Sequence, residues 1–568
     1  MTPKKLVIVG GVAGGASCAA RARRLNENVE IKIFERSAYI SYANCGLPYH
    51  VGGVIRRQEE LFLATADLFY DRFLVDVQTD CEAVAVDPVK KVLTVHDLNT
   101  GETLEETYDW LLLSPGAAPL VPPDLPGVNL PGLFTVRTVT DALAMNRWIA
   151  DKEPQVAVVA GAGYIGLEMA ENLARRGLTV HLVERENQIM PAVDPEMAVL
   201  VARRLKKKGI HLHLGSPVQG FSEKDGGLSV ALPGQEIACQ MVVLSLGVRP
   251  EIKLAVEAGI EIGERGGILV DDRMCTSAPD VFAVGDAVEV KGYVLGDQRY
   301  LPLATPANLQ GRLVADVLFG SGQPEPRYRG SQASAVVGIF GLTLAMTGET
   351  EKSLAAARAR GVEVEWEKVY LHPGHHAGYY PGAKDIALKI LYSKKDGRIL
   401  GAQAVGEAGV DKRMDVIAMA IQMDATVDDL AQAQLCYAPQ YGSAKDAVNM
   451  AGMVAGNALH GLYDVVHWTD VPGSDALILD VRSEKEVKDY PVPGALFIHT
   501  DSVRAHLDEL PRDREIWTFC LVGVRSYLVT RMLTQHGFAS KTLSGGILTR
   551  QAFIEALGEE AVAIPGTL

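Results

Sequence analysis

A strand, a glycine-rich turn and a helix occur twice in this chain, and this repeat constrains the fold more than any other feature. In the first copy the apolar run 6–10 precedes a turn through Gly14, and a second apolar run, 29–34, ends at Glu35. Glycines let a backbone approach the pyrophosphate of a dinucleotide, and an acidic residue after the second strand can bind a ribose hydroxyl. Val12 stands at the middle glycine of the GxGxxG pattern, so the first copy is a partial match.

The second copy matches the pattern fully. The run 156–160 leads into Gly161-Ala-Gly-Tyr-Ile-Gly166, and the later run 180–183 ends at Glu184. Two such units predict an α/β fold with two Rossmann-like domains, because two matches are much harder to obtain by accident than one. Glu184 favours the free 2′-hydroxyl of NADH, although the neighbouring Arg185 keeps NADPH open.

Charge and cysteine usage narrow the class of protein. The 568-residue chain has 55 Lys and Arg against 70 Asp and Glu, a net charge of −15, which argues against nucleic acid or an anionic membrane as partner. No apolar run reaches the length of a membrane span, and residues 1–5 lead into no signal-peptide pattern. Seven cysteines without a CxxC pair predict reduced thiols in the cytoplasm, with neither disulfides nor a metal site.

Two further segments, 111–119 and Thr276–Asp286, carry a resemblance to a known family. They resemble the second and third fingerprints of the two-dinucleotide-binding flavoprotein disulfide reductases. The resemblance implies that the first unit binds FAD, with the aspartate of the Gly-Asp pair on the ribityl chain, and that the second unit binds NAD(P)H. The implied cofactor-binding residues are Gly10, Ala13, Gly14, Glu35, Arg36, Asn44, Ser114, Gly116, Gly161, Gly163, Ile165, Gly166, Glu184, Gly247 and Asp286.

Cys45 is the candidate redox-active residue of the reductase part. It lies ten residues after Glu35, where a helix should begin, and a thiol near a helix amino terminus and a flavin is stabilised as the reactive thiolate. Disulfide reductases with a CxxxxC pair have a second cysteine five residues later, but this position is His50. The sequence therefore predicts that Cys45 works without a resolving cysteine.

The stretch around Cys45 resembles the single-cysteine group of this family, which includes CoA-disulfide reductases, NADH oxidases and NADH peroxidases. In that group the cysteine forms either a mixed disulfide with a thiol substrate or a sulfenic acid. The oxidase and peroxidase branch carries a histidine at the position of Ala13. Its absence here makes reduction of oxygen or peroxide the weaker interpretation.

Two tyrosine-bearing segments favour the CoA-disulfide branch. Residues 376–382 and 437–452 resemble segments in which tyrosines of the partner subunit assist the departure of the thiol. The resemblance transfers this role to Tyr379 and Tyr437, with Tyr380 as the alternative to Tyr379. Packing at a dimer interface is the other common use of such tyrosines.

Coenzyme A brings several phosphates to an acidic chain, so its site must be locally basic. The helix after the first glycine turn supplies arginines, Ser41 and Asn44 flank Cys45, and the resemblance adds the helix start 306–312. The candidate CoA-binding residues are Arg21, Arg24, Ser41, Asn44, Arg72, Asn308 and Arg312.

A separate α/β pattern begins near His467. The motifs DVR at 480–482, PGA at 493–495, CxxGxR at 520–525 and LSGG at 543–546 occur in this order and resemble a single rhodanese domain. Cys520, the backbone amides after it and Arg525 then form an anion cradle that lowers the thiol pKa and holds a persulfide. The loop from Cys520 to Arg525 spans six residues, which favours sulfur over phosphate chemistry, although the usual histidine before PGA is absent.

The predicted organisation has five parts. They are an FAD-binding domain (1–115 and 246–325), an NAD(P)H-binding domain (116–245), an α+β dimerisation domain (326–452), a linker (453–466) and a rhodanese-like α/β domain (467–568). The predicted protein is a homodimeric, FAD-dependent NAD(P)H oxidoreductase that reduces CoA persulfide, polysulfide or CoA disulfide through a Cys45–CoA mixed disulfide. The alternatives are an NADH oxidase or peroxidase, and a flavin redox sensor whose rhodanese domain recruits a partner.

Overall fold

The structure is a computed structural model that describes residues 3–322 and 324–566. The chain forms two compact units, Met1–Arg185 with Ser216–Ser331, and Glu186–Gly215 with Gln332–Leu568. Each unit combines helices and sheets, which confirms the predicted α/β fold class. The outermost bounds of the predicted domains, residues 1 and 568, lie outside the described residues.

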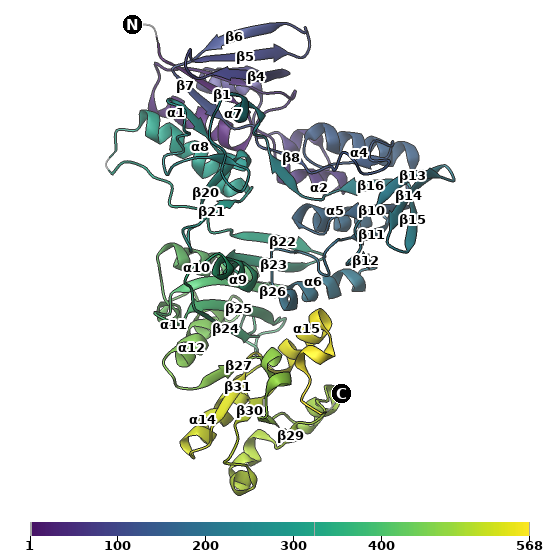
Figure 1. Cartoon of the computed structure of the whole chain (residues 1–568), viewed down its shortest axis with the longest axis vertical. Helices are drawn as coiled ribbons and strands as arrows, with labels where there is room; N and C mark the ends of the chain where they lie inside the picture. Colours follow the sequence, from purple (N-terminus) through teal and green to yellow (C-terminus); the bar gives the residue numbers. More distant parts are fainter. Residues whose placement is uncertain (1–2, 323, 567–568) are drawn as a thin grey trace. The chain divides into compact units, whose positions relative to one another are not determined.

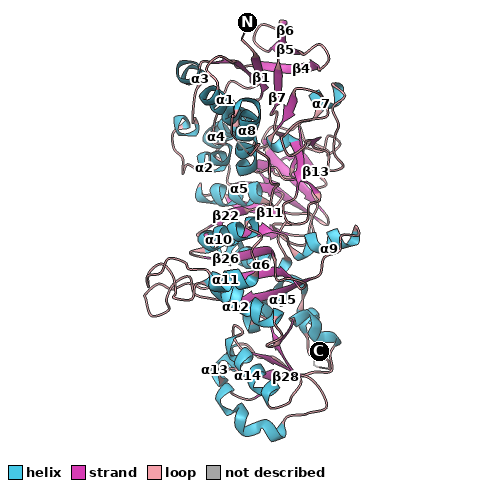
Figure 2. Cartoon of the chain, turned by 90° about the vertical axis from the view of Figure 1, so that its left-hand side faces the viewer, coloured by secondary structure: helices cyan, strands magenta, loops and turns pink. Residues whose placement is uncertain are grey.

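A parallel sheet forms the core of the first unit. Its strands are β1 (Lys5–Val9), β2 (Glu30–Phe34), β3 (Val75–Gln78), β7 (Trp110–Leu113) and β19 (Val281–Ala283), in the order β19-β7-β1-β2-β3. The central strand β1 is almost completely buried because both faces of the sheet are covered. Helices α1 (Ala13–Leu25) and α8 (Ala304–Phe319) pack against each other on one side of this sheet (Figure 2).

The second glycine turn belongs to another parallel sheet of the same unit. The strands of this sheet that belong to the first unit are β9 (Leu133–Phe134), β10 (Val156–Ala160), β11 (Thr179–Val183) and β16 (Met241–Leu244), in the order β11-β10-β16-β9. Helix α5 (Tyr164–Arg175) follows the turn after β10. Beside it, α4 (Val139–Lys152) starts with a capping box in which Thr138 and Asp141 exchange hydrogen bonds. Both sequence repeats therefore form strand, turn and helix.

Smaller elements complete the first unit. The helices are α2 (Leu47–Val51), α3 (Ala66–Phe73) and α7 (Lys253–Glu257). The strands form the sheets β4 (Cys81–Asp87)-β5 (Val92–Asp97)-β6 (Thr103–Thr107), β13 (Gly220–Lys224)-β14 (Gly227–Leu232)-β15 (Gln235–Cys239), β17 (Val248–Pro250)-β8 (Ala117–Pro119) and β18 (Ile268–Leu269)-β20 (Val288–Lys291)-β21 (Gln298–Tyr300).

An antiparallel sheet is the centre of the second unit. It has the order β22-β23-β26-β25-β24 and consists of β22 (Ala335–Ile339), β23 (Leu342–Gly348), β24 (Trp366–Leu371), β25 (Ile386–Ser393) and β26 (Ile399–Gly406). The helices of this part are α6 (Pro195–Lys207), α9 (Glu351–Ala359), α10 (Val410–Gln422), α11 (Val427–Gln432) and α12 (Ala447–Leu459), and β12 (His211–His213) is a short strand. Helix α10 packs on β23 and β26.

A parallel sheet and its helices end the second unit. The sheet has the order β27-β31-β30-β28-β29, with β27 (Asp464–Val466), β28 (Leu477–Asp480), β29 (Leu496–Phe497), β30 (Ile516–Phe519) and β31 (Ser540–Leu543). Its helices are α13 (Glu484–Asp489), α14 (Val524–Gln535) and α15 (Gly546–Leu557). Figure 1 shows these C-terminal elements in yellow and yellow-green, with α15 beside α6.

The segment 453–466, predicted as a linker, has regular structure instead. It contains the end of α12 and all of β27, the edge strand of the C-terminal sheet. A Cβ on Gly452, directly before this segment, would lie 2.3 Å from the backbone nitrogen of Ala431, and one on Gly456 would lie 2.9 Å from the Asp428 carboxylate. Glycine at these two positions of α12 allows the close approach of α11.

A buried lysine binds three segments of the second unit together. The Lys389 ammonium is fully buried and lies 2.7 Å from Asp194 and 2.6 Å from Glu196, with Glu351 as the third carboxylate partner. These partners raise the pKa of Lys389, so the group stays charged despite burial, which alone would lower its pKa. The lysine occupies the centre of the only carboxylate group that could otherwise hold a metal ion among the described residues.

Tyr370 connects this network to the C-terminal sheet. Its hydroxyl donates to Glu196 at 2.9 Å, while its backbone nitrogen donates to the Ser544 hydroxyl at 2.9 Å. The ring of Tyr370 packs within the hydrophobic core that contains Trp468, Phe519 and Phe553. The C-terminal domain is therefore packed onto its neighbour through a shared core.

We predict that Lys389→Met strongly destabilises the second unit. Removal of the ammonium leaves buried carboxylates without a counter-charge, which costs about 3–5 kcal/mol. Urea unfolding followed by fluorescence should show a lower midpoint for this variant. Lys395→Met, at an exposed position two residues beyond β25, is the matched control and should unfold like the unmodified protein. Equal midpoints for the two variants would contradict the role of Lys389.

Candidate active sites

The first glycine turn forms a narrow cradle between β1 and α1. Gly10 has φ 95°, and a Cβ there would lie 2.1 Å from the Ser114 carbonyl oxygen at the end of β7. The Glu35 carboxylate, at the end of β2, accepts from the Gly11 nitrogen at 2.8 Å. Helix α1 starts without a side-chain cap or an acidic residue in its first turn, so its amide groups remain available to a phosphate. Ala13 and Gly14 form this first turn.

A second group of predicted cofactor residues gathers around Arg137. The Arg137 guanidinium lies 3.5 Å from the Asp286 carboxylate, and a Cβ on Gly116 would lie 2.7 Å from it. With its amide oxygen turned toward Arg137, Asn44 accepts from the same guanidinium. Burial raises the pKa of Asp286, and the charge of Arg137 opposes that rise. Sequence reasoning missed Arg137, which no glycine or cysteine motif marks.

The second glycine turn repeats this construction. Gly161 has φ 101°, and a Cβ on Gly166 would lie 1.9 Å from the Gly161 carbonyl oxygen. Gly163, in contrast, faces open space, as a position beside a bound phosphate must. Glu184 accepts from the Ala162 nitrogen at 2.8 Å, the counterpart of the Glu35 contact. Among the remaining predicted cofactor residues, Ile165 is exposed, Gly247 faces open space with φ 115°, and the exposed Arg36 lies 3.7 Å from both Glu82 and Glu251.

Cys45 lies in a 3-10 turn, Asn44–Gly46, directly before the short helix α2. Partial burial of the sulfur raises its pKa, the charges of Glu168 and Asp286 raise it further, and Arg137 lowers it. The groups that the chain itself supplies thus raise the pKa of Cys45, and stabilisation of the thiolate by a helix terminus together with a bound flavin stays a prediction. Helix α2 has only five residues, and two carboxylates outweigh one guanidinium.

Glu168 is a further residue of this site that sequence reasoning missed. The Tyr49 hydroxyl donates to the Glu168 carboxylate at 3.1 Å, and burial raises the pKa of Glu168 to about 7. Its charge also raises the pKa of Cys45. Its position two residues after Gly166 was the available signal, because the start of that helix faces the dinucleotide. The negative charge near Cys45 thus changes around neutral pH.

The predicted tyrosines form a hydroxyl pair on the surface of the second unit. The Tyr379 and Tyr437 hydroxyls lie 2.8 Å apart, although 58 residues separate them, and the side chains are 75% and 48% exposed. The hydrogen bond to Tyr437 raises the pKa of Tyr379. Tyr380 is also exposed, but its ring packs edge-on against His376.

Arg413 holds the two tyrosine segments together. Its buried guanidinium forms an ion pair with Asp446 at 2.7 Å and donates to the His375 carbonyl oxygen at 2.6 Å. His375 precedes Tyr379 in the chain and Asp446 follows Tyr437, so this arginine contacts both tyrosine segments. Sequence reasoning missed this arginine because its partners are remote in sequence.

The structure brings part of the predicted CoA set together along α1 and α8. Arg21 lies 2.7 Å from Asp316, Arg312 lies 3.7 Å from the same carboxylate, and Asn308 accepts from the Ser17 hydroxyl at 2.6 Å. Asp316 thus offsets part of the positive charge. Arg24 and Arg72 are exposed, and Ser41 has a positive φ of 46°. Arg23, on the same helix as Arg21 and Arg24, is buried and donates to the carbonyl oxygens of Phe73 and Leu74.

Cys520 lies in a closed loop after β30. The Cys520 sulfur is buried and accepts from the Gly523 nitrogen at 3.1 Å, and Gly523 has φ 107°. Arg525 forms two hydrogen bonds with the Glu486 carboxylate, at 2.8 and 2.7 Å. This ion pair lowers the pKa of Glu486 to about 2. Among the backbone amides of the predicted cradle, that of Gly523 contacts the sulfur. Glu486 offsets the charge of Arg525, which the sequence had assigned wholly to the anion.

The other C-terminal motifs position this loop. In the DVR motif, buried Arg482 lies 2.6 Å from Asp480 and donates to the backbone of α13, which carries Glu486. Directly after the LSGG motif, the Ile547 nitrogen donates to the Cys520 carbonyl oxygen at 2.9 Å. A Cβ on Gly546 would lie 2.4 Å from that oxygen, so glycine is required.

Comparisons with known proteins place these sites in a family. Residues 4–311 match the model for "Pyridine nucleotide-disulphide oxidoreductase", and residues 334–448 match the model for its dimerisation domain. The chain belongs to the pyridine nucleotide-disulphide oxidoreductase family. This confirms the resemblance seen in the sequence and identifies the chain as an enzyme of the flavoprotein disulfide reductase type.

Named relatives cover different parts of this oxidoreductase. A coenzyme A disulfide reductase of Staphylococcus haemolyticus is 32% identical over 452 residues, which cover 80% of this chain and 99% of the relative. The structure of reduced CoADR-RHD of Bacillus anthracis is 42% identical, with a TM-score of 0.94 over 98% of this chain and 99% of that one. A NAD-dependent persulfide reductase from A. fulgidus is 34% identical, with a TM-score of 0.87 over 96% and 99%.

FAD and NAD(P)H are the cofactors typical of this family, and the two glycine turns of the oxidoreductase fit them. The required glycines, the uncapped start of α1 and the carboxylates Glu35 and Glu184 are the features that dinucleotides need. When bound, the flavin passes electrons between nicotinamide and sulfur. Within residues 3–322 and 324–566, no helix is long and apolar enough to cross a membrane.

We predict that Glu168→Gln lowers the pKa of Cys45, because the substitution removes a negative charge that disfavours the thiolate. The rate of Cys45 alkylation, followed by peptide mass spectrometry, should rise at about pH 8, where Glu168 is ionised. Below about pH 6 the two proteins should react alike, because Glu168 is then neutral in the unmodified enzyme. Glu223→Gln, on the exposed strand β13, is the control. Unchanged alkylation at high pH would refute the electrostatic coupling.

We predict that Glu486→Gln reduces stability in a pH-dependent way. The folded pKa of Glu486 is lowered from 4.5 to about 2, so its ion pair contributes fully above about pH 4.5 and is lost as the pH falls toward 2. Urea midpoints should therefore differ between variant and unmodified protein at neutral pH and converge in acid. Glu484→Gln, at an exposed position on the same helix, controls for removal of a charge. A constant difference at all pH values would show another cause.

Proposed function

We propose that this chain is a homodimeric NAD(P)H-dependent reductase of CoA persulfide or CoA disulfide, with Cys45 as the attacking thiol. The observation that carries the proposal is the exposed thiol of Cys45. His50 stands five residues later, where related disulfide reductases have the resolving cysteine. Such a thiol completes a reduction by forming a mixed disulfide with the substrate thiol. The names of the relatives and the match to the dimerisation domain support CoA as that thiol and the dimer as the assembly.

The proposed reaction first forms a mixed disulfide between Cys45 and CoA and then reduces it. The Cys45 thiolate attacks the CoA-side sulfur of CoA persulfide, the sulfur–sulfur bond breaks, hydrosulfide leaves, and a Cys45–CoA disulfide forms. Two-electron reduction of this disulfide regenerates the Cys45 thiolate and releases CoA thiol. FAD, held by Glu35, Asp286 and the glycines of the first turn, would supply these electrons from NAD(P)H. In total, CoA persulfide, NAD(P)H and one proton give CoA thiol, hydrogen sulfide and NAD(P)⁺. With CoA disulfide, a second CoA thiol replaces hydrogen sulfide.

The tyrosine pair supplies the proposed proton donor. The Tyr379–Tyr437 hydrogen bond raises the pKa of Tyr379, so the Tyr379 phenol stays protonated at neutral pH and can donate to a departing thiolate. Arg413 holds the two segments in the arrangement that pairs the hydroxyls. We assign the donor role to Tyr437 and Tyr379 of the partner subunit, with Tyr380 as the alternative to Tyr379.

The proposed cofactor and CoA sites follow the predicted residues. Glu35, Asp286 and the glycines of the first turn would hold FAD, and Glu184 with the second turn would hold the pyridine nucleotide. Arg21, Arg312 and Asn308 line one edge of the proposed CoA site, and exposed Arg24 and Arg72 can approach its phosphates. The proposed domain limits remain those predicted, with β27 added to the rhodanese-like domain.

We propose that the C-terminal domain carries sulfane sulfur on Cys520. The contact from the Gly523 nitrogen to the Cys520 sulfur supports this role, because backbone donors stabilise a sulfur anion. The long coverage of the CoADR-RHD and persulfide reductase structures adds support. Transfer to CoA would then supply the persulfide that Cys45 reduces.

A water-forming NADH oxidase is the second candidate. The oxidase of Lactobacillus brevis is 27% identical, with a TM-score of 0.75 over 80% of this chain and 99% of that one. The exposed Cys45 thiol could be oxidised to a sulfenic acid in such a cycle. Ala13 in place of histidine and the paired tyrosines favour the CoA reaction instead.

We predict that the two reactive cysteines are separable. Cys45→Ser should abolish NADH-dependent reduction of every sulfur acceptor while FAD remains bound, because the attacking sulfur is lost. Cys520→Ser should abolish sulfur transfer from thiosulfate or polysulfide and spare reduction of preformed CoA persulfide. Both activities are measured on both variants, with half-buried Cys275→Ser as control. Retained acceptor reduction in Cys45→Ser would refute the mechanism, and loss of both activities in folded Cys520→Ser would refute the separation.

A further inference from the structure

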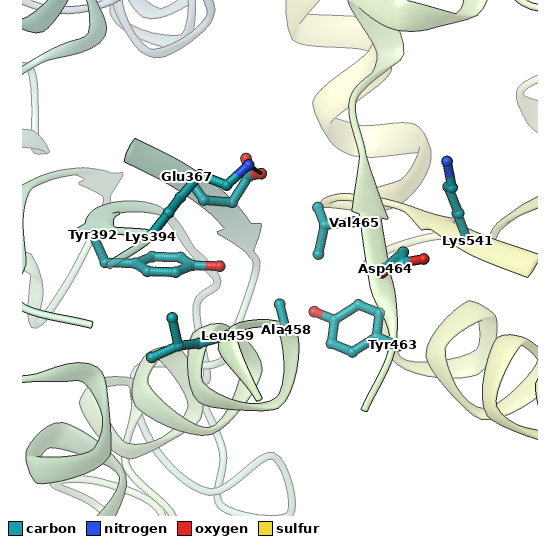
Figure 3. A pocket seen from close by; sticks show the side chains of 9 residues that line it. All are labelled: Glu367, Tyr392, Lys394, Ala458, Leu459, Tyr463, Asp464, Val465 and Lys541. Atoms are coloured by element: carbon teal, nitrogen blue, oxygen red, sulfur yellow. Dashed lines mark ion pairs between the residues drawn. The ribbon is translucent and has the colours of Figure 1, made fainter. Parts of the chain in front are cut away.

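A cleft of about 400 Å³ lies in the second unit, where the antiparallel sheet meets the C-terminal domain. One wall comes from β24, β25 and α12, and the other from β27 and β31 (Figure 3). The lining residues are Glu367, Tyr392, Lys394, Ala458, Leu459, Tyr463, Asp464, Val465 and Lys541. Small-molecule sites have volumes in this range and occur preferentially at domain interfaces.

The cleft is separate from the sulfur loop. Asp464 and Lys541 lie at the amino ends of β27 and β31, whereas Cys520 follows the carboxyl end of β30. These strands are parallel, and Thr518 in β30 is paired with Thr542 in β31. The cleft and Cys520 therefore lie at opposite ends of the same sheet.

The hydroxyl of a nearly buried tyrosine opens into this cleft. Tyr392 is 1% exposed and lines the cleft, and its hydroxyl has no hydrogen-bond partner among the described residues. Figure 3 shows this hydroxyl directed toward the space in front of Tyr463. Burial and the charge of Glu367 raise the pKa of Tyr392, so the group remains a hydrogen-bond donor. Because this hydroxyl reaches the open space of the cleft, a ligand there can accept its hydrogen bond in place of water.

The opposite wall offers a matching acceptor. The Tyr463 hydroxyl donates its hydrogen to the Val454 carbonyl oxygen at 3.2 Å, so its oxygen can only accept from a ligand. Figure 3 shows the Tyr463 hydroxyl directed toward the same space as that of Tyr392. Ala458, Leu459 and Val465 supply apolar contact around it.

Charges at the cleft are mostly balanced within the protein. Glu367 pairs with His467 at 2.9 Å and lies 3.8 Å from the Lys394 ammonium, while Lys541 pairs with Glu515 at 2.8 Å. Asp464 adds one further negative charge at the rim. These paired charges thus favour a ligand with an uncharged polar group. That group must accept a hydrogen bond from Tyr392 and donate one to Tyr463. A secondary amide offers both within one planar unit.

We infer that the cleft binds a small molecule through a secondary amide, with its carbonyl oxygen on Tyr392 and its N–H on Tyr463. Two kinds of sulfur carrier contain such amides, namely peptide thiols such as glutathione and the pantetheine arm of coenzyme A. The inference depends on the fold of the second unit alone, and it holds whether or not Cys45 and Cys520 perform the proposed reactions.

Calorimetric titration of the full-length protein tests the inference. S-methyl-glutathione and S-methyl-pantetheine are titrated separately, because thioethers cannot exchange with the protein thiols. At least one should bind, and Tyr392→Phe should weaken that binding about three- to tenfold, the effect of one lost hydrogen bond. Ala458→Leu, which narrows the cleft, should weaken it as well. Tyr70→Phe, which alters an exposed tyrosine of α3 in the first unit, should leave the affinity unchanged.

Thermal unfolding separates loss of the site from loss of the fold. Because the Tyr392 hydroxyl has no partner in the described chain, unliganded Tyr392→Phe should be at least as stable as the unmodified protein. Binding of only one probe identifies the peptide or the pantetheine source. Absence of binding by both probes at millimolar concentration, or binding that neither Tyr392→Phe nor Ala458→Leu weakens, would overturn the inference.

Discussion

The reductase part depends on one steric constraint, the absence of a Cβ where a strand turns into a helix. At Gly10 and Gly161 a side chain would collide with the carbonyl oxygens of Ser114 and Ser245. The same turns direct the amide groups of the following helices toward the ends of the sheets, where a dinucleotide pyrophosphate can bind. The carboxylates of Glu35 and Glu184 are held at these turns by backbone amides. A larger residue would displace both the helix and the cofactor cradle.

Continuity of packing distinguishes the second unit. Lys389 joins the start of α6 to β25 and α9, Tyr370 joins this network to Ser544, and the LSGG motif containing Ser544 also contacts the Cys520 loop. Buried ion networks tolerate few substitutions because removal of any one member leaves another buried charge unpaired. The C-terminal domain therefore shares a core with its neighbour. The amide site inferred at this junction uses the space that the two partners leave between them.

The two reactive cysteines have different environments. Cys45 is exposed and has Glu168, Asp286 and Arg137 as its charged surroundings, so its pKa is raised by the chain. Cys520 is buried and accepts a backbone hydrogen bond, while Glu486 draws the charge of Arg525 toward itself. An exposed thiol suits exchange with a substrate, and an enclosed sulfur suits storage of a group that water would remove. The arrangement supports a division of work between the two sites.

Residues adjacent in sequence determined much of what could be predicted: both dinucleotide units, the α/β class, and the motifs around Cys45 and Cys520. Strand, turn and helix patterns are local, so a single chain segment contains the whole signal. Only the tertiary structure revealed Arg137, Glu168, Arg413 and Glu486, because their partners come from distant segments or other elements. It also replaced the expected linker with α12 and β27, since glycine favours close helix packing as readily as flexibility and sequence alone does not separate the two.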